Sequence, residues 1–182
     1  VILARGASRR MGSPKGLLPC PGQTGMSFLR AIAMAYKALE IPVVVVTTSD
    51  LVFGYQQELV GTGAGSVAGF PEGGETGRTL MHGWEMAGAE TTHLWAHPVD
   101  LPLVTIETLE FLKFHSSQYP AKLIRAEYEG SPGHPVILPV AGLAGMQEHH
   151  AWHLAPMREV IALALARGHI AEPLLVAVAD AG

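Results

Sequence analysis

The sequence predicts an α/β fold, a three-layer α/β/α sandwich around a Rossmann-like, mostly parallel sheet. Short apolar runs alternate with segments whose apolar residues recur at helical spacing. The run 43–48, VVVVTT, is continuous and β-branched, as expected for a strand covered on both faces. The resulting order, β-α-β-α-β-α-β-α-β-β-α-β, is the alternation that builds a parallel sheet between two helical layers.

The individual elements follow from periodicity and from glycine and proline at their ends. Helix 26–40 ends just before Pro42, helix 155–168 ends at Gly168, and the glycine-rich segment 61–77 is mostly loop. We expect strands at 1–3, 43–48, near Val67, 92–97, 121–128, 134–139 and 174–180, and helices at 26–40, 50–59, 78–89, 106–118 and 155–168. A glycine-proline loop joins the two consecutive strands 121–128 and 134–139.

Length and composition indicate one globular domain spanning residues 1–182. The chain is 48% hydrophobic and has a formal charge of -4, which argues against a general nucleic-acid or anionic-membrane binder. Cys20 is the only cysteine, which fits a reducing compartment, and we expect a cytoplasmic protein. The chain begins inside a strand-like run, so we expect further residues before Val1 and after Gly182.

The segment 4–16, ARGASRRMGSPKG, concentrates four cations on a glycine-rich loop. Glycine turns free backbone N–H groups, and Arg5, Arg9, Arg10 and Lys15 add fixed charge, a combination that suits a polyphosphate. A Walker A motif and a dinucleotide fingerprint are both excluded by the glycine and lysine spacing. The alternative is a charged, solvated surface loop.

A second polar loop, PVDLPLVT at 98–105, follows the predicted strand 92–97. Ligands of such folds bind at the carboxyl ends of the strands, so Asp100 is expected beside the opening loop. A carboxylate there is a suitable ligand for a hard cation. An Asp before Leu-Pro can also simply start a turn or cap a helix.

The segment LARGASRRMGSPKGLLP resembles the signature of the MobA-like nucleotidyltransferases, L-x-x-G-x-S-x-R-M-G-x-x-K-x-L-L. The segments TGRTLMHGWEMA, HPVDLPLV and GHPV match further motifs of this family in order, so the resemblance covers nearly the whole chain. The matching residues of the first motif are Leu3, Gly6, Ser8, Arg10, Met11, Gly12, Lys15, Leu17 and Leu18.

The resemblance implies a sheet of the nucleotide-diphospho-sugar transferase type and a magnesium-dependent transfer of a nucleoside monophosphate from an NTP to a phosphorylated acceptor, such as molybdopterin. It implies that Arg10, Lys15 and Asp100 are catalytic, that Asp100 holds Mg²⁺ and that His134 contacts the acceptor; for His134, a structural turn is an equal alternative. A molybdoenzyme partner would also follow. The implied nucleotide-binding residues are Leu3, Ala4, Arg5, Gly6, Ser8, Gly12 and Lys15.

The chain departs from the family pattern in three places. Arg5 stands where guanylyltransferases usually carry glycine and cytidylyltransferases alanine, although HPVD and GHPV favour CTP over GTP. FPEGGETG has Glu72 and Glu75 but no Asn, which family members often carry. The C-terminal D-x-D-T-P, with a second metal carboxylate, does not occur before Gly182, and Asp180 is not expected to replace it.

Other polar and aromatic residues have weaker functional interpretations. EHHAWH could bind zinc through His149 and His153 on one helical face, with His150 beside them, but it lacks a third ligand and a surface segment is the expected interpretation. We expect His93 and His97 to be packing or edge residues of a strand. The three tryptophans are expected in or near the core rather than stacking on a base: Trp84, Trp95 and Trp152.

Two further functions are compatible with the sequence. One is a sugar- or alcohol-phosphate nucleotidyltransferase. The other is a non-catalytic nucleotide- or pterin-binding chaperone that helps to insert the cofactor into a partner enzyme, which missing acidic residues would favour.

Overall fold

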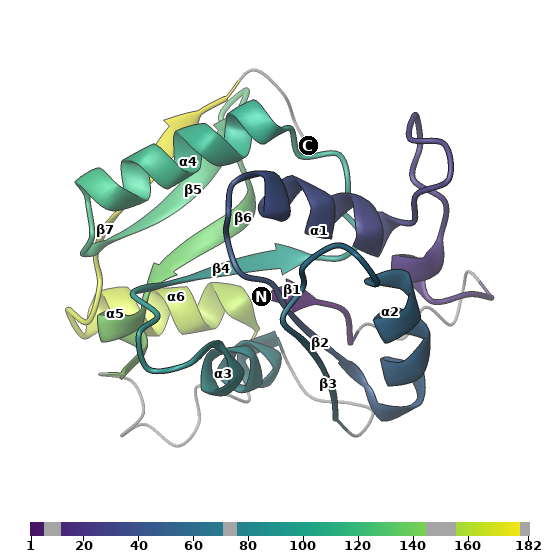
Figure 1. The fold of residues 1–182 in the computed structure, drawn as a ribbon. Helices are drawn as coiled ribbons and strands as arrows, with labels where there is room; N and C mark the ends of the chain where they lie inside the picture. Colours follow the sequence, from purple (N-terminus) through teal and green to yellow (C-terminus); the bar gives the residue numbers. More distant parts are fainter. Residues whose placement is uncertain (6–11, 71–75, 145–155, 179–182) are drawn as a thin grey trace.

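A single sheet organises the computed structural model, which describes residues 1–5, 12–70, 76–144 and 156–178 (Figure 1). The strand order is β3-β2-β1-β4-β6-β5-β7. All neighbours pair in parallel except β6, which runs antiparallel to β4 and β5. The strands are β1 (Ile2–Leu3), β2 (Val44–Thr48), β3 (Ser66–Phe70), β4 (His93–Pro98), β5 (Lys122–Tyr128), β6 (Ser131–Pro139) and β7 (Ala171–Ala177).

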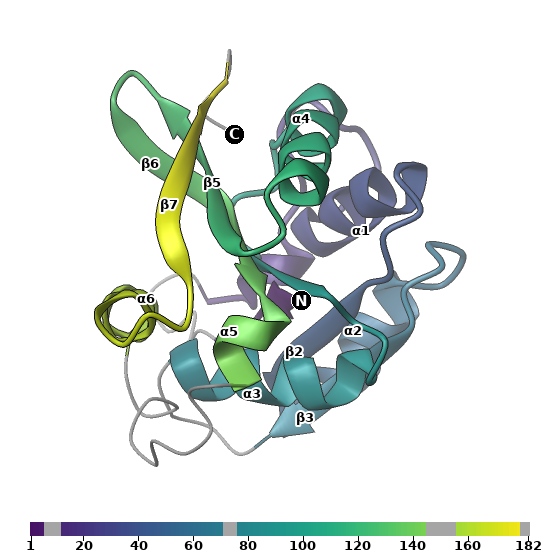
Figure 2. The ribbon, with the colours of Figure 1, turned by 90° about the vertical axis from the view of Figure 1, so that its left-hand side faces the viewer.

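Helices cover both faces of this sheet, which gives the expected three layers (Figure 2). Helices α1, α2 and α4 pack on one face, and α3, α5 and α6 on the other. Two short 3₁₀ helices, η1 (Lys15–Leu17) and η2 (Ser49–Leu51), lie in loops that follow β1 and β2. The α-helices are α1 (Phe28–Ala38), α2 (Val52–Glu58), α3 (Thr76–Ala87), α4 (Ile106–Gln118), α5 (Val140–Ala144) and α6 (Met157–Ala166).

Local sequence explains where the two longest helices on the first face begin. The Ser27 Oγ accepts a hydrogen bond from the Arg30 amide at 3.1 Å, and the Thr105 Oγ1 accepts one from the Thr108 amide at 3.2 Å. Each hydroxyl satisfies one of the amides that a helix start leaves unpaired. None of the helices in the described ranges is long and apolar enough to cross a lipid bilayer.

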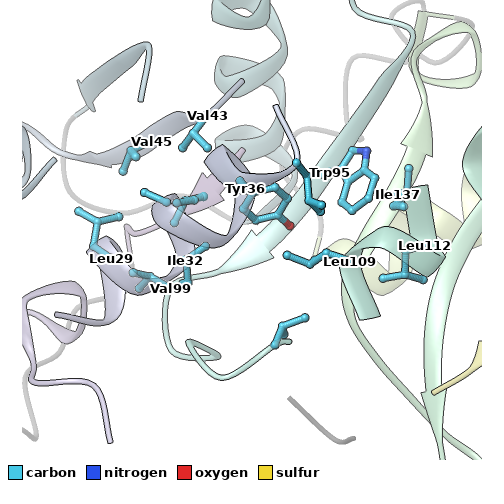
Figure 3. Packing of buried hydrophobic residues seen from close by; sticks show 14 of the residues in the cluster. Leu29, Ile32, Tyr36, Val43, Val45, Trp95, Val99, Leu109, Leu112 and Ile137 are labelled. Carbon is cyan, nitrogen blue, oxygen red and sulfur yellow. The ribbon is translucent and has the colours of Figure 1, made fainter. Parts of the chain in front are cut away.

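The alternation of side chains along the strands supplies two separate cores. On β4, Trp95 faces the cluster under α1 and α4, whereas Leu94 and Ala96 face the cluster under α3 and α6. Figure 3 shows the first cluster, in which Tyr36 of α1 lies beside Trp95. Burial of both faces explains why the strands read as continuous apolar runs rather than alternating ones.

Most of the predicted elements are confirmed, with three differences. The predicted glycine-proline loop before residue 134 is wrong: a tight turn at Glu129–Gly130, both with positive φ, lets β6 start at Ser131. The last strand is Ala171–Ala177 rather than 174–180, because it pairs with β5 from Lys122 onward. The short helix α5 follows β6 directly and was not expected.

Candidate nucleotide-binding site

The ends of β1 and β4 bring two loops together at the carboxyl edge of the sheet. Leu3 is in register with Pro98 of β4 and with Val46 of β2. The chain remains anchored one residue further on, because the Ala4 amide donates to the Val46 carbonyl at 2.9 Å. On the other side, the Val99 amide donates to the Leu3 carbonyl at 3.2 Å. Arg5 and Asp100, the residues that follow Ala4 and Val99, therefore lie at the same edge of the sheet.

Lys15 and Asp100 meet at this place. The Lys15 Nζ donates to the Asp100 Oδ2 at 2.6 Å, although 85 positions separate the two residues in the chain. Their side chains are 38% and 44% exposed, so water or a ligand can reach both charges. An exposed ion pair contributes little to stability, and its charges are available to a substrate.

The backbone under Lys15 is supported from α2. Gly16 lies against the buried ring of Tyr55, and a Cβ at this glycine would stand 2.8 Å from the Tyr55 hydroxyl oxygen. Only glycine allows this close approach. Gly12, at the start of the described part of the loop, has a φ of 67°, which also favours glycine.

Arg5 lies on the opposite side of β1 from this support. Its Nη1 is 3.4 Å from the Thr79 Oγ1 of α3, and its guanidinium lies 6.0 Å from the centre of the Phe70 ring. The Phe70 ring in turn stacks on His82 at 3.6 Å. Burial, followed by the neighbouring Arg78, lowers the pKa of Arg5, which still stays a cation at neutral pH.

Arg5 and His134 line a cavity of about 360 Å³. The structure places His134 within β6 rather than in a loop. Its Nδ1 is buried and has no hydrogen-bond partner among the described residues. Burial and then Arg125 lower the pKa of His134. The cavity is lined by Leu3, Arg5, Thr76, Thr79, Pro98, His134 and Met157.

A larger cavity, of about 880 Å³, lies at the opposite edge, at the amino ends of the strands. Val43, Ser66 and His93 line it, and it is mostly apolar. Ligands of open parallel sheets bind at the carboxyl edge, and the paired charges lie there as well. The smaller cavity is therefore the better candidate for the site.

Several predicted residues fall outside the described ranges. Among the described residues, no group of three or more His, Cys, Asp or Glu side chains is arranged to hold a metal. The predicted residues outside the described ranges are Gly6, Ser8, Arg9, Arg10, Met11, Glu72, Glu75, His149, His150, Trp152, His153 and Asp180.

Several residues that contact the site were not predicted as site residues from the sequence. Phe70, Thr79 and Tyr55 reach it only through the tertiary fold, and no spacing pattern connects them to Lys15. Trp95 is buried and Trp84 packs against the second cluster, as expected for core residues. His97 is buried, as expected, but both of its ring nitrogens are hydrogen-bonded.

Fold and site together define an α/β domain with paired charges at the carboxyl edge of its sheet. The family model of the MobA-like NTP transferase domain matches residues 1–171, and the chain belongs to this family. It is therefore a nucleotidyltransferase. No curated protein sequence matches the chain.

Several solved structures share the fold of this chain at low sequence identity. Rv0371c from Mycobacterium tuberculosis H37Rv is similar with a TM-score of 0.72 and 18% identity, over 99% of this chain and 88% of that one. Its complex with manganese is similar with a TM-score of 0.70 and 17% identity, over 97% and 86%. The 4-diphosphocytidyl-2C-methyl-D-erythritol synthase from Anaerococcus prevotii DSM 20548 has a TM-score of 0.73 and 11% identity, over 97% and 86%.

Proposed function

We propose that this chain transfers a nucleoside monophosphate from an NTP to a phosphorylated small-molecule acceptor and releases pyrophosphate. CTP is the preferred donor over GTP in this proposal, and a pterin phosphate such as molybdopterin is the acceptor, in the cytoplasm. The observation that carries it is the contact of 2.6 Å between the Lys15 Nζ and the Asp100 Oδ2 at the joined ends of β1 and β4.

The charges of this pair suit a metal-bound triphosphate. Lys15 supplies a fixed cation for phosphate oxygens, and Arg10, from the same motif, is proposed to supply a second. In the free protein Asp100 neutralises Lys15. A triphosphate with about four negative charges competes for Lys15 and leaves the carboxylate available for a cation.

The donor set fits a hard divalent cation that shares its coordination with the substrate. Asp100 offers carboxylate oxygens, which Mg²⁺ prefers, and the ion keeps waters and phosphate oxygens for the rest of its shell. Rv0371c, which shares this fold, has been solved in complex with manganese, and this supports a divalent cation in the proposed reaction. When bound, this cation would offset negative charge on the triphosphate.

The transfer itself is a displacement at phosphorus. An oxygen of the acceptor phosphate forms a bond to the α-phosphorus, and the bond between this phosphorus and the bridging oxygen to the β-phosphate breaks. Pyrophosphate leaves with that electron pair. The chain contributes position and charge: Lys15 and Arg10 hold the triphosphate in line, and no covalent intermediate with the protein is needed.

The cavity next to Arg5 suits the acceptor. Arg5 contributes a cation to its wall, and His134 lies in the same wall. The shifted pKa keeps His134 neutral at pH 7, so this ring can donate or accept without adding charge. A phosphorylated acceptor would bind here with its phosphate toward Lys15.

Pyrophosphate release tests this proposal directly. The chain is incubated with CTP, GTP or ATP, Mg²⁺ and one acceptor from a panel of pterin, sugar and alcohol phosphates. The expected result is release that requires both partners and is fastest with CTP and a pterin phosphate. Release with a sugar or alcohol phosphate alone would change the acceptor class. Tight NTP binding without release under any condition would support the chaperone function and a molybdoenzyme partner instead.

A further inference from the structure

His97 is a buried polar residue that the proposed reaction does not use directly. Its side chain is 2% exposed, and it lies near the carboxyl end of β4, three positions before Asp100. Both ring nitrogens have partners. The Tyr36 hydroxyl lies 2.9 Å from Nδ1, and the Leu101 carbonyl oxygen lies 2.8 Å from Nε2.

These two partners define the protonation of the ring. A carbonyl oxygen only accepts hydrogen bonds, so Nε2 carries the proton and donates to Leu101. In the neutral ring Nδ1 then accepts, and the Tyr36 hydroxyl donates to it. The result is a directed chain of hydrogen bonds from Tyr36 through His97 to the backbone of Leu101. Tyr36 lies on α1, and its ring makes T-shaped contacts with the rings of Trp95 and His97, with centroids 5.8 and 5.6 Å away.

These hydrogen bonds end at the carbonyl oxygen of Leu101, the residue that follows Asp100. The Leu101 amide donates to the Pro98 carbonyl at 3.2 Å, which closes the turn that carries Asp100. On the near side of Asp100, the Val99 amide donates to Leu3 of β1 at 3.2 Å. The backbone of Asp100 is therefore held from both sides, by β1 before it and by His97 after it.

We propose that His97, held by Tyr36, is a positioning residue that keeps the Asp100 carboxylate where it can share a divalent cation with a bound triphosphate. This inference rests on the proposed function, in which Asp100 is the metal carboxylate. Residues that orient a metal ligand from behind typically change metal affinity by about 10–100-fold when they are replaced.

Two substitutions separate the two hydrogen bonds. His97→Gln keeps an amide N–H near the position of Nε2 and can still donate to Leu101. His97→Asn is one bond shorter, retains a group near Nδ1 for Tyr36 and loses the donor to Leu101. Thr62→Val is the matched control, because it removes another buried donor, from the Thr62 hydroxyl to the Leu59 carbonyl at 2.7 Å, away from the Asp100 turn.

The readouts are the Mn²⁺ concentration for half-saturation of the CTP-bound protein, by electron paramagnetic resonance, and amide hydrogen exchange in peptides covering 98–103. We expect His97→Asn to raise that Mn²⁺ concentration about tenfold and to speed exchange in this segment. His97→Gln should restore most of both properties, and CTP binding without metal should stay as in the wild type. Tyr36→Phe, which removes only the hydroxyl, should give a smaller change in the same direction.

The outcomes separate this inference from the function on which it rests. If Mn²⁺ binding in His97→Asn and Tyr36→Phe matches that in Thr62→Val, the positioning role is wrong and the proposed function stands. If Asp100→Asn also leaves the Mn²⁺ requirement unchanged, the metal role of Asp100 is wrong, and the inference falls with it.

Discussion

Lys15 is the residue whose charge most directly meets the triphosphate in this account. Lys15→Ala should weaken NTP binding by about 1–3 kcal/mol, the contribution of a charge-assisted hydrogen bond. We expect a similar loss for Arg10→Ala and a smaller one for Arg9→Ala, since the family pattern leaves that position free. Lys37→Ala is the control, because Lys37 donates to the Gly61 carbonyl on another loop. Isothermal titration calorimetry with CTP measures all four, and equal affinities would refute the phosphate assignment.

The family resemblance predicts that Arg5 lies at a position connected with the choice of nucleobase. Its contacts with Thr79 and Phe70 place it beside the opening loop and the cavity rather than in solvent. Arg5→Ala should therefore change the ranking of CTP, GTP and ATP more than it changes the metal requirement. Competition binding among the three nucleotides measures this, and an unchanged ranking would limit Arg5 to a phosphate or acceptor contact.

His97 also makes the stability of the fold depend on pH. Burial lowers the pKa of His97 from 6.5 to about 4, so between these pH values the histidine is protonated in the unfolded chain but neutral in the folded chain. This contribution is fully present above pH 6.5 and is lost as the pH falls to about 4, a change of about 3 kcal/mol. Urea unfolding at pH 7 and pH 4.5 should show a smaller drop for His97→Gln than for the wild type. Equal drops would mean that His97 titrates normally.

At the scale of elements, η1 packs against α2, and their closest approach is between Gly16 and Tyr55. A methyl group at Gly16 would meet Tyr55 at 2.8 Å, whereas one at Gly54 of α2 would find its nearest neighbour at 3.8 Å. Gly16→Ala should displace the turn that carries Lys15 and weaken CTP binding by about 1–2 kcal/mol, as overpacking does. Gly54→Ala should leave binding unchanged and slightly stabilise α2. Equal CTP affinity in both variants would show that the turn adapts.

The elements that periodicity predicted best are those with one strong local signal. Helix α4 has the predicted bounds, 106–118, and Gly168, with a φ of 70°, follows α6 as a C-terminal glycine. β6 was predicted too short because Pro132 and Gly133 are typical of loops, whereas the pairing of Ser131 with Tyr128 and of Pro132 with Glu127 extends the strand. The meeting of the two loops that carry Lys15 and Asp100 was anticipated, because strand order placed both loops at one edge, but the direct contact between these side chains was not.

The tertiary details of the site could not be predicted in this way. The partners of His97 come from α1 and from the turn after β4, and those of Arg5 from β3 and α3. A buried histidine in a strand has the same local sequence signature whether it packs or positions a neighbour. Only the three-dimensional arrangement distinguishes these roles.

At the scale of the whole molecule, the fold joins sequence-distant charges by pairing the first strand with the fourth. β1 lies between β2 and β4 (Figure 1), so the carboxyl ends of β1 and β4 are neighbours, and Lys15 contacts Asp100 at this edge. The helices on both faces keep this edge fixed, whereas the ion pair itself adds little stability. Replacing either charge should therefore leave the fold intact and change only the chemistry at the edge.

The central claim, that this edge carries out nucleotidyl transfer, is tested most directly by pyrophosphate release from Asp100→Asn. Asparagine keeps the size and removes the charge, with Glu110→Gln on α4 as the matched control. We expect Asp100→Asn to abolish transfer and to leave CTP binding without metal unchanged or slightly tighter, because a repulsive charge is gone, whereas Glu110→Gln should be fully active. Full transfer activity in Asp100→Asn would contradict the central claim.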